Sequence, residues 1–277
     1  MSVTHPQGFS AAGTAGGLKS SGKKDVALVV NEGPQFVGVG VFTSNRVYAA
    51  PVAWSRQVVA DGRVDAVILN SGGANAATGP EGFADTHTTA EHVAEALQQT
   101  GRDISAGDVV VCSTGLIGTR LPMDKLLGGV DAAVAALAND GGADAAEAIM
   151  TTDTVAKTAV VEGGDWSIGG MAKGAGMLAP GMATMLCVIT TDAQIDAAQA
   201  RLALTEAVRV TLNRLDSDGC MSTNDTVVLL ANGASGASPE PSTFQAALTE
   251  LCHDLAQQLL RDAEGADHDI AITVQGA

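Results

Sequence analysis

Short apolar runs rich in β-branched residues recur along the chain and constrain its fold more than any other feature. Turn residues bound each run, as expected for buried strands, at residues 25–30, 37–42, 66–70, 108–112, 185–190, 226–231 and 269–274. Stretches with helical periodicity lie between them, at 83–99, 123–137, 194–215 and from Ser242 onward. This alternation predicts an α/β fold, a sandwich of β-sheets flanked by helices.

The clearest predicted helix begins near Ser242. Its apolar residues recur at intervals of three and four and form one stripe: Phe244, Leu248, Leu251, Leu255 and Leu259. Ser242 and Gln245 have the spacing of a capping box, which predicts the start of the helix. The preceding stretch, 233–242, is rich in Gly, Ser and Pro and is expected to be a loop.

Composition narrows the possible partners. The 277 residues are 46% hydrophobic, enough for a large core, and carry a formal charge of −16. Such a charge repels a phosphate backbone, so we expect no nucleic-acid partner. No uninterrupted apolar run approaches membrane-spanning length, and the amino terminus lacks a secretory signal. We therefore expect a cytoplasmic protein without a membrane partner.

Metal sites and histidine-based catalysis have little support in the sequence. The four cysteines are far apart and form no CxxC motif, and the five histidines are scattered. No P-loop, G-x-S-x-G or H-E-x-x-H motif is present. We therefore expect no metal site and reduced cysteines.

Two predicted strands run directly into polar, glycine-rich turns. These are "NSGGANAATG" at 70–79 and "CSTGLIG" at 112–118. Backbone N–H groups in such turns can bind an anion or a developing negative oxygen. In the second turn, Thr114 and Gly115 are suitable oxyanion donors.

Thr184 is an isolated hydroxyl at a predicted change from loop to strand, in "PGMATMLCVIT". One interpretation is packing, which the residues alone favour. The other is that Thr184 cleaves the bond after Ala183, so that its freed α-amino group becomes the base for its own hydroxyl. The positive charge of Lys173 would lower the pKa of that amine.

Six blocks in order make the chain similar to a known family: "NSGGANAATG", "CSTGLIG", "AIMTTDT", "GGMAKGAGMLAPGMATML", "STNDT" and "DAEG". Together they resemble the ornithine acetyltransferases, also called glutamate N-acetyltransferases, and the actinobacterial members in particular. The resemblance extends from about Gly8 to the last residue.

The resemblance implies a precursor that cleaves itself between Ala183 and Thr184. The products would be an α segment, 1–183, and a β segment, 184–277, which remain associated as a heterodimer or a heterotetramer of two such pairs. The enzyme would use a ping-pong mechanism in arginine biosynthesis. N-acetylornithine would acetylate Thr184, and glutamate would then accept the acetyl group. No cofactor is implied, although some relatives also accept acetyl-CoA as a substrate.

The resemblance also implies residue roles. Thr184 would be the nucleophile, and Thr114 with Gly115 the oxyanion pair. Lys173, Thr151 and Glu264 would contact the substrate, with Glu264 placed to pair with the δ-ammonium of ornithine.

The sequence departs from the family pattern in two ways. Gly73 and Ala77 stand where relatives often carry Asn and Cys. Family members also continue beyond the position of Ala277, so we expect a truncated β segment that lacks some substrate contacts. Two alternatives therefore stay open. The chain could be non-catalytic and bind a metabolite or partner, or it could be an N-terminal-nucleophile amidase or aminopeptidase that passes the acyl group to water.

Overall fold

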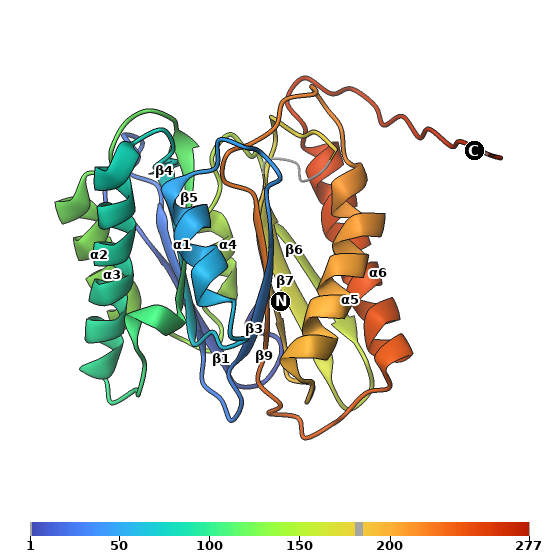
Figure 1. The fold of residues 1–277 in the computed structure, drawn as a ribbon, viewed down its shortest axis with the longest axis horizontal. Helices are drawn as coiled ribbons and strands as arrows, with labels where there is room; N and C mark the ends of the chain where they lie inside the picture. The colour runs from blue at the N-terminus through green and yellow to red at the C-terminus, as the bar shows by residue number, and fades with distance from the viewer. Residues whose placement is uncertain (1, 181–184, 277) are drawn as a thin grey trace.

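Two β-sheets are stacked face to face between two layers of helices (Figure 1). This arrangement is seen in a computed structural model that describes residues 2–180 and 185–276. It confirms the predicted sandwich of sheets flanked by helices. Most strands are apolar on both faces, because one face packs on the other sheet and the second on helices.

The first sheet has the strand order β1-β2-β4-β5, with β4 and β5 parallel and the other pairs antiparallel. Its strands are β1 (Phe9–Thr14), β2 (Val26–Asn31), β4 (Ala66–Gly73) and β5 (Val109–Leu116). Helices α2 (Gly79–Gln98) and α3 (Met123–Ala135) supply apolar side chains to its outer face. Helix α1 (Ala50–Val58) packs against β5 and α2, and the 3-10 turn η1 (Ala106–Asp108) leads into β5.

The second sheet has the order β3-β9-β8-β7-β6, with only β8 and β9 parallel. Its strands are β3 (Val37–Phe42), β6 (Lys157–Glu162), β7 (Ser167–Lys173), β8 (Leu186–Thr191) and β9 (Thr226–Ala231). Helices α5 (Ala197–Val210) and α6 (Pro241–Arg261) cover its outer face, where the stripe predicted on α6 is buried.

The two sheets share an apolar core between them. Small residues of α4 (Gly142–Ala148) belong to this core together with Val29 and Val67 of one sheet and Met171 and Val228 of the other. Strands from before and after residues 181–184 alternate in the second sheet: β8 and β9 lie between β3 and β7. The sheet is therefore built jointly by the two predicted segments.

Several details differ from the sequence prediction. The helix expected over 194–215 ends at Val210, and the 3-10 turn η2 (Leu212–Arg214) follows. The capping box is wrong, because Glu240 is the N-cap of α6 and no side chain caps this helix. The strand predicted at 269–274 is also wrong: these residues are exposed and pair with no strand among the described residues. The short, glycine-containing strands β1 and β7 and the polar strand β6 had escaped the apolar pattern.

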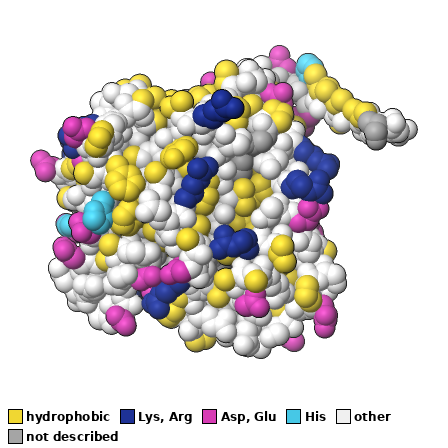
Figure 2. Space-filling view, viewed as in Figure 1, with side chains coloured by type: hydrophobic (Ala, Val, Ile, Leu, Met, Phe, Trp, Pro, Cys, Tyr) yellow, Lys and Arg dark blue, Asp and Glu magenta, His cyan; other side chains and the backbone are white. Residues whose placement is uncertain are grey.

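The surface has no continuous basic area on the face shown in Figure 2, where Lys and Arg side chains stand as separate spots. Within residues 2–180 and 185–276, no helix combines the length and apolarity needed to cross a bilayer.

Candidate active site

Two predicted site residues meet where strands from the two sheets end. Thr114 lies near the end of β5, and Lys173 is the last residue of β7. Lys173 Nζ donates a hydrogen bond of 3.1 Å to Thr114 Oγ1, although the residues are 59 positions apart. Both residues are buried, with 2% of Lys173 and 6% of Thr114 exposed. A hydroxyl that accepts a hydrogen bond from Lys173 keeps its own hydrogen free to donate.

Gly115 brings the end of β5 against the end of β4. Its φ is +130°, and a Cβ at this position would lie 2.6 Å from Gly72 C and from Gly73 N. Only glycine accommodates both the backbone angle and this close approach. The glycine of the block "STG" is therefore required by the backbone structure, in addition to its predicted role as an oxyanion donor.

A cleft of about 440 Å³ opens beside Gly115. Its lining consists of Leu18, Lys19, Ser20, Ser21, Gly72, Gly115 and Thr151. Two of the predicted site residues, Gly115 and Thr151, thus share one cavity. Lys19 had been missed, although a lysine next to a Gly-Ser turn in an acidic chain was an available signal.

Asp153 organises the segment that carries Thr151. Its carboxylate accepts hydrogen bonds from Thr151 N at 2.9 Å, from Gly174 N at 2.7 Å and from Lys157 Nζ at 2.7 Å. Burial opposes the charged form, but the nearby Lys173 and these bonds outweigh it and lower the pKa of Asp153. A charged Asp153 therefore links Thr151 to the backbone that follows Lys173.

Glu264 approaches the same segment from the C-terminal side of α6. Glu264 N donates to Ala175 O at 2.6 Å. The exposed Glu264 carboxylate lies about 3.4 Å from the position of a Cβ on Gly176. The predicted contact residue is therefore close in space to the turn after Lys173.

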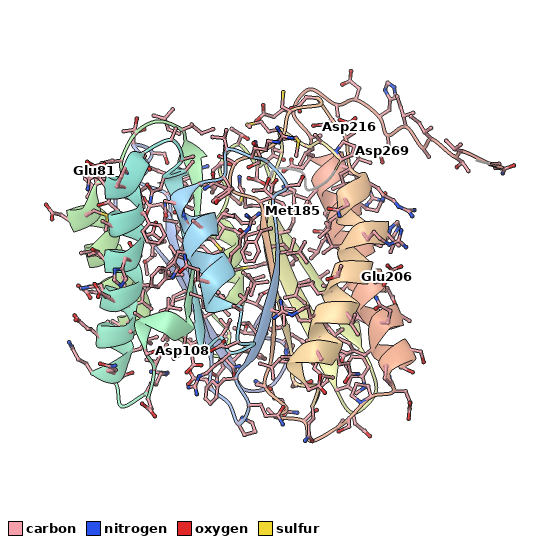
Figure 3. The ribbon with its side chains drawn as sticks, viewed as in Figure 1. Glu81, Asp108, Met185, Glu206, Asp216 and Asp269 are labelled. Atoms are coloured by element: carbon pink, nitrogen blue, oxygen red, sulfur yellow. The ribbon has the colours of Figure 1, made fainter. Side chains whose placement is uncertain are left out.

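Ala183 and Thr184 lie outside the described residues, but the next residue is held firmly. Met185 is 1% exposed, and Figure 3 shows it between the flanking helix layers. Met185 N donates to Asp225 Oδ1 at 3.1 Å, and Met185 O accepts from Thr226 N at 3.1 Å. Asp225 had been missed as a site residue; its only sequence signal was its place in the block "STNDT".

Lys173 and Asp225 are buried ionisable groups that influence each other electrostatically. Burial lowers the pKa of Lys173 to about 8, although Asp153 and Asp225 favour its charged form. Burial raises the pKa of Asp225 to about 8, against the hydrogen bond from Met185 N and the charge of Lys173. Asp225 Oδ2 has no hydrogen-bond partner among the described residues. Perturbed groups of this kind gather at functional sites.

Asn224 ties the second sheet to the turns of the first. Its Nδ2 donates to Ala74 O at 2.6 Å and to Ser113 O at 2.8 Å. These bonds fix the loop before β9 against the ends of β4 and β5. Within the described part of the chain, no cluster of three or more His, Cys, Asp or Glu side chains could hold a metal ion.

Sequence comparison gives one family over nearly the whole chain. The ArgJ family matches residues 10–277. A protein from Streptomyces avermitilis, named "Arginine biosynthesis bifunctional protein ArgJ", is 61% identical over 277 residues, 100% of this chain and 71% of that protein. A protein of the same name from Thermobifida fusca is 62% identical with the same coverage.

Structural comparison agrees. An ornithine acetyltransferase from Mycobacterium tuberculosis, solved with ornithine, is 59% identical with a TM-score of 0.64; the match covers 67% of this chain and 96% of that one. An aminopeptidase and amidase from Ochrobactrum anthropi, described as a variant of the Ntn-hydrolase fold, has a TM-score of 0.55 at 14% identity. That match covers 96% of this chain and 88% of the other, and it concerns the fold alone.

Proposed function

This chain belongs to the ArgJ family, and on that premise we propose that it transfers an acetyl group from N-acetylornithine to glutamate through an acetyl ester on Thr184. The names of the relatives and the ornithine-bound structure support this reaction. The observation in this molecule that carries the proposal is the buried hydrogen bond from Lys173 Nζ to Thr114 Oγ1. It joins two predicted site residues next to the cleft that Gly115 and Thr151 line.

Self-cleavage would create the nucleophile. Thr184 Oγ attacks the carbonyl carbon of Ala183, the C–N bond breaks, and the hydroxyl proton passes to the nitrogen. Water then hydrolyses the ester and leaves a free α-amine and a free hydroxyl on Thr184. The hydrogen bond from Met185 N to Asp225 fixes the residue that follows this bond.

Chain lengths among the relatives support cleavage at this point. The Mycobacterium tuberculosis chain is matched over 96% of its length by only 67% of this chain, so it is the shorter of the two. The relatives named ArgJ are longer than this chain, which covers 71% of them at similar identity. A cut in that protein near the position of Ala183 would account for its short chain.

The transfer itself uses the same groups. The α-amine of Thr184 takes the hydroxyl proton while Oγ attacks the acetyl carbonyl. The Thr114 hydroxyl and the Gly115 N–H donate to the negative oxygen, and the adjacent Lys173 ammonium stabilises it. The C–N bond breaks, the proton goes to the departing ornithine amine, and an acetyl ester remains. The amine of glutamate attacks that ester, and Oγ recovers a proton.

Substrate contacts follow from the positions around the cleft. Thr151 lines it, Lys173 next to Thr114 would contact the substrate, and the exposed Glu264 carboxylate would pair with the δ-ammonium of ornithine. No cofactor takes part in this scheme. Acetyl-CoA is a second candidate donor of the acetyl group, because the relatives are named bifunctional. The cleaved segments would work as an α/β heterodimer, paired further into a heterotetramer.

Intact-protein mass spectrometry combined with an acetyl-transfer assay tests the proposal. We expect two masses that meet at the Ala183–Thr184 bond, and transfer of acetyl from N-acetylornithine to glutamate. Thr184→Ala should give one uncut and inactive chain. Cleavage that persists in this variant would contradict the proposal. Release of free acetate without acetylglutamate would instead favour an amidase, and binding without turnover would favour a non-catalytic chain.

A further inference from the structure

Lys19 places a positive charge at the wall of the cleft. Lys19 Nζ donates to Lys24 O at 2.7 Å and, more weakly, to Ala148 O at 3.4 Å. Its backbone N is held by the buried carboxylate of Asp25 at 2.9 Å. The half-buried side chain is therefore anchored at the wall that also contains Gly115.

The absence of an ion pair is notable in a chain with 31 acidic and 15 basic side chains. Lys24 pairs with Asp144 and Glu147, whereas Lys19 pairs with no carboxylate among residues 2–180 and 185–276. An ammonium has three N–H donors, and carbonyls occupy two of those of Lys19. The third is available to a ligand in the cleft.

Burial also makes Lys19 responsive to an anion. Burial lowers the pKa of Lys19, and the negative charges of Asp25 and Asp153 oppose this shift. A carboxylate bound at the ammonium would restore the solvation that burial removes. Ser20 and Ser21, which are exposed in the same lining, add hydroxyl donors.

The chemistry of the two substrates identifies the group that Lys19 would bind. N-acetylornithine and glutamate differ at the side-chain end, but both carry an α-carboxylate on the carbon that holds the reacting nitrogen. When the reacting carbonyl lies at Gly115, this carboxylate must lie within a few bonds of it, in the cleft that Lys19 lines. Lys173 is 2% exposed and bound to Thr114, so it offers a carboxylate little access.

We propose that Lys19 binds the α-carboxylate common to both substrates and so forms a carboxylate subsite of the cleft. This inference rests on the proposed function for the identity of the substrates. Glu264, beside Gly176, would bind the opposite end of ornithine. The subsite explains how one cleft can hold donor and acceptor in turn.

Calorimetric binding of ornithine and of ornithinamide, which lacks the carboxylate, tests the subsite without requiring turnover. We expect the wild-type protein to bind ornithine at least about tenfold more tightly than the amide. Lys19→Gln keeps an N–H donor for the two carbonyls but removes the charge, so the preference should fall to about one. Lys19→Arg should retain most of it.

Lys23→Gln is the matched control. It removes the same charge from the same loop, but Lys23 is exposed and does not line the cleft, so the preference should stay at the wild-type value. A general loss of structure in a variant would weaken the binding of both ligands, whereas loss of the subsite weakens the binding of ornithine and leaves that of ornithinamide at the wild-type value. The subsite is refuted if the wild-type protein shows no preference for the carboxylate, or if Lys19→Gln keeps it.

The acetyl-transfer assay separates this inference from the proposed function. The wild-type protein could prefer ornithine over ornithinamide through Lys19 and yet transfer no acetyl group. That result would support the subsite and refute the transferase. If the wild-type protein transfers the acetyl group and Lys19→Gln keeps the wild-type preference for ornithine, the transferase is supported and the subsite is refuted.

Discussion

At the scale of single residues, the site depends on polar groups that are buried and yet have few partners. The Lys173 ammonium donates to the Thr114 hydroxyl, while one oxygen of Asp225 accepts from Met185 N and the other has no hydrogen-bond partner in the described part of the chain. Burying such groups costs stability, and proteins retain them where chemistry needs a charge in a poorly solvated position.

Replacing Thr114 tests its role as an oxyanion donor. Thr114→Val keeps the shape of the side chain but removes the hydroxyl, so the cleaved enzyme should lose about 100- to 1000-fold in kcat with a nearly unchanged KM. Steady-state acetyl-transfer kinetics measure both parameters. Thr114→Ser restores a hydroxyl and should recover much of the rate. A Thr114→Val enzyme with the kcat of the wild type would exclude Thr114 from the oxyanion site.

The protonation of Asp225 should make stability depend on pH. Folding raises its pKa from 3.8 to about 8, so the folded protein holds a proton that the unfolded chain releases in this range. The stabilising contribution is full below about pH 4 and is lost as the pH rises toward 8. Asp225→Asn mimics the neutral form at every pH. The melting temperature of this variant minus that of the wild type should therefore be larger at pH 8 than at pH 5.

Scanning calorimetry at the two pH values measures this difference. Asp225→Ala serves as the comparison, because it removes the acceptor of Met185 N and should be destabilised at both pH values. A difference between Asn variant and wild type that does not change with pH would show that Asp225 is charged in the folded protein.

At the scale of elements, the close approach of β4 and β5 sets the shape of the cleft. Parallel pairing places the two glycine-rich turns side by side, with Gly115 against Gly72 and Gly73. Asn224, from the loop before β9, then bonds to the carbonyls of Ala74 and Ser113 and holds the other sheet in place. The ends of β4 and β5 therefore form one part of the cleft wall, and the loop at 18–21 lines another.

A methyl group at Gly115 should disrupt this arrangement. Gly115→Ala combines a strained φ of +130° with backbone atoms 2.6 Å from the new Cβ, so we expect a loss of more than about 2 kcal/mol in the free energy of unfolding. Gly118→Ala is the control, because its φ is +87° but nothing lies within 4 Å of the new Cβ. It should cost only about 1 kcal/mol. Equal losses in denaturant titrations would show that the close approach is unimportant.

At the scale of the whole molecule, the two predicted segments are interleaved. The β7 strand of the first segment pairs with β8 of the second over Ile168–Lys173, and β3 pairs with β9 over Val37–Phe42. The core between the sheets also combines residues of both segments. A cut after Ala183 would therefore leave the strand pairing and the core intact.

We expect the cleaved segments to stay together until the protein unfolds. Native mass spectrometry should show one species that contains 1–183 and 184–277, and denaturing conditions should release two. Because the two segments share a sheet, they can separate only if strand pairs and buried apolar contacts are lost, which amounts to global unfolding. Segments that separate in native buffer would contradict the shared-sheet explanation.

Local patterns in the sequence predict most helices and strands, and the ordered motifs indicate the family. Apolar runs marked most strands of both sheets, and the stripe on α6 marked its buried face, because each depends on residues close in the chain. The tail at 269–274 shows the limit of this reasoning, because an apolar pattern forms a strand only where a neighbouring strand accepts its hydrogen bonds.

The contacts between polar residues of the site depend on the tertiary structure. Thr114 and Lys173 are 59 positions apart, and Met185 and Asp225 are 40 apart. Their contacts depend on the strand order and on how the two sheets stack, which no local pattern encodes. The same holds for Lys19, whose place near Gly115, at the end of β5, and Thr151, in a separate loop, depends on how these segments pack at one cleft. Burial then sets the charges of these groups, since desolvation acts only after the sheets have closed over them.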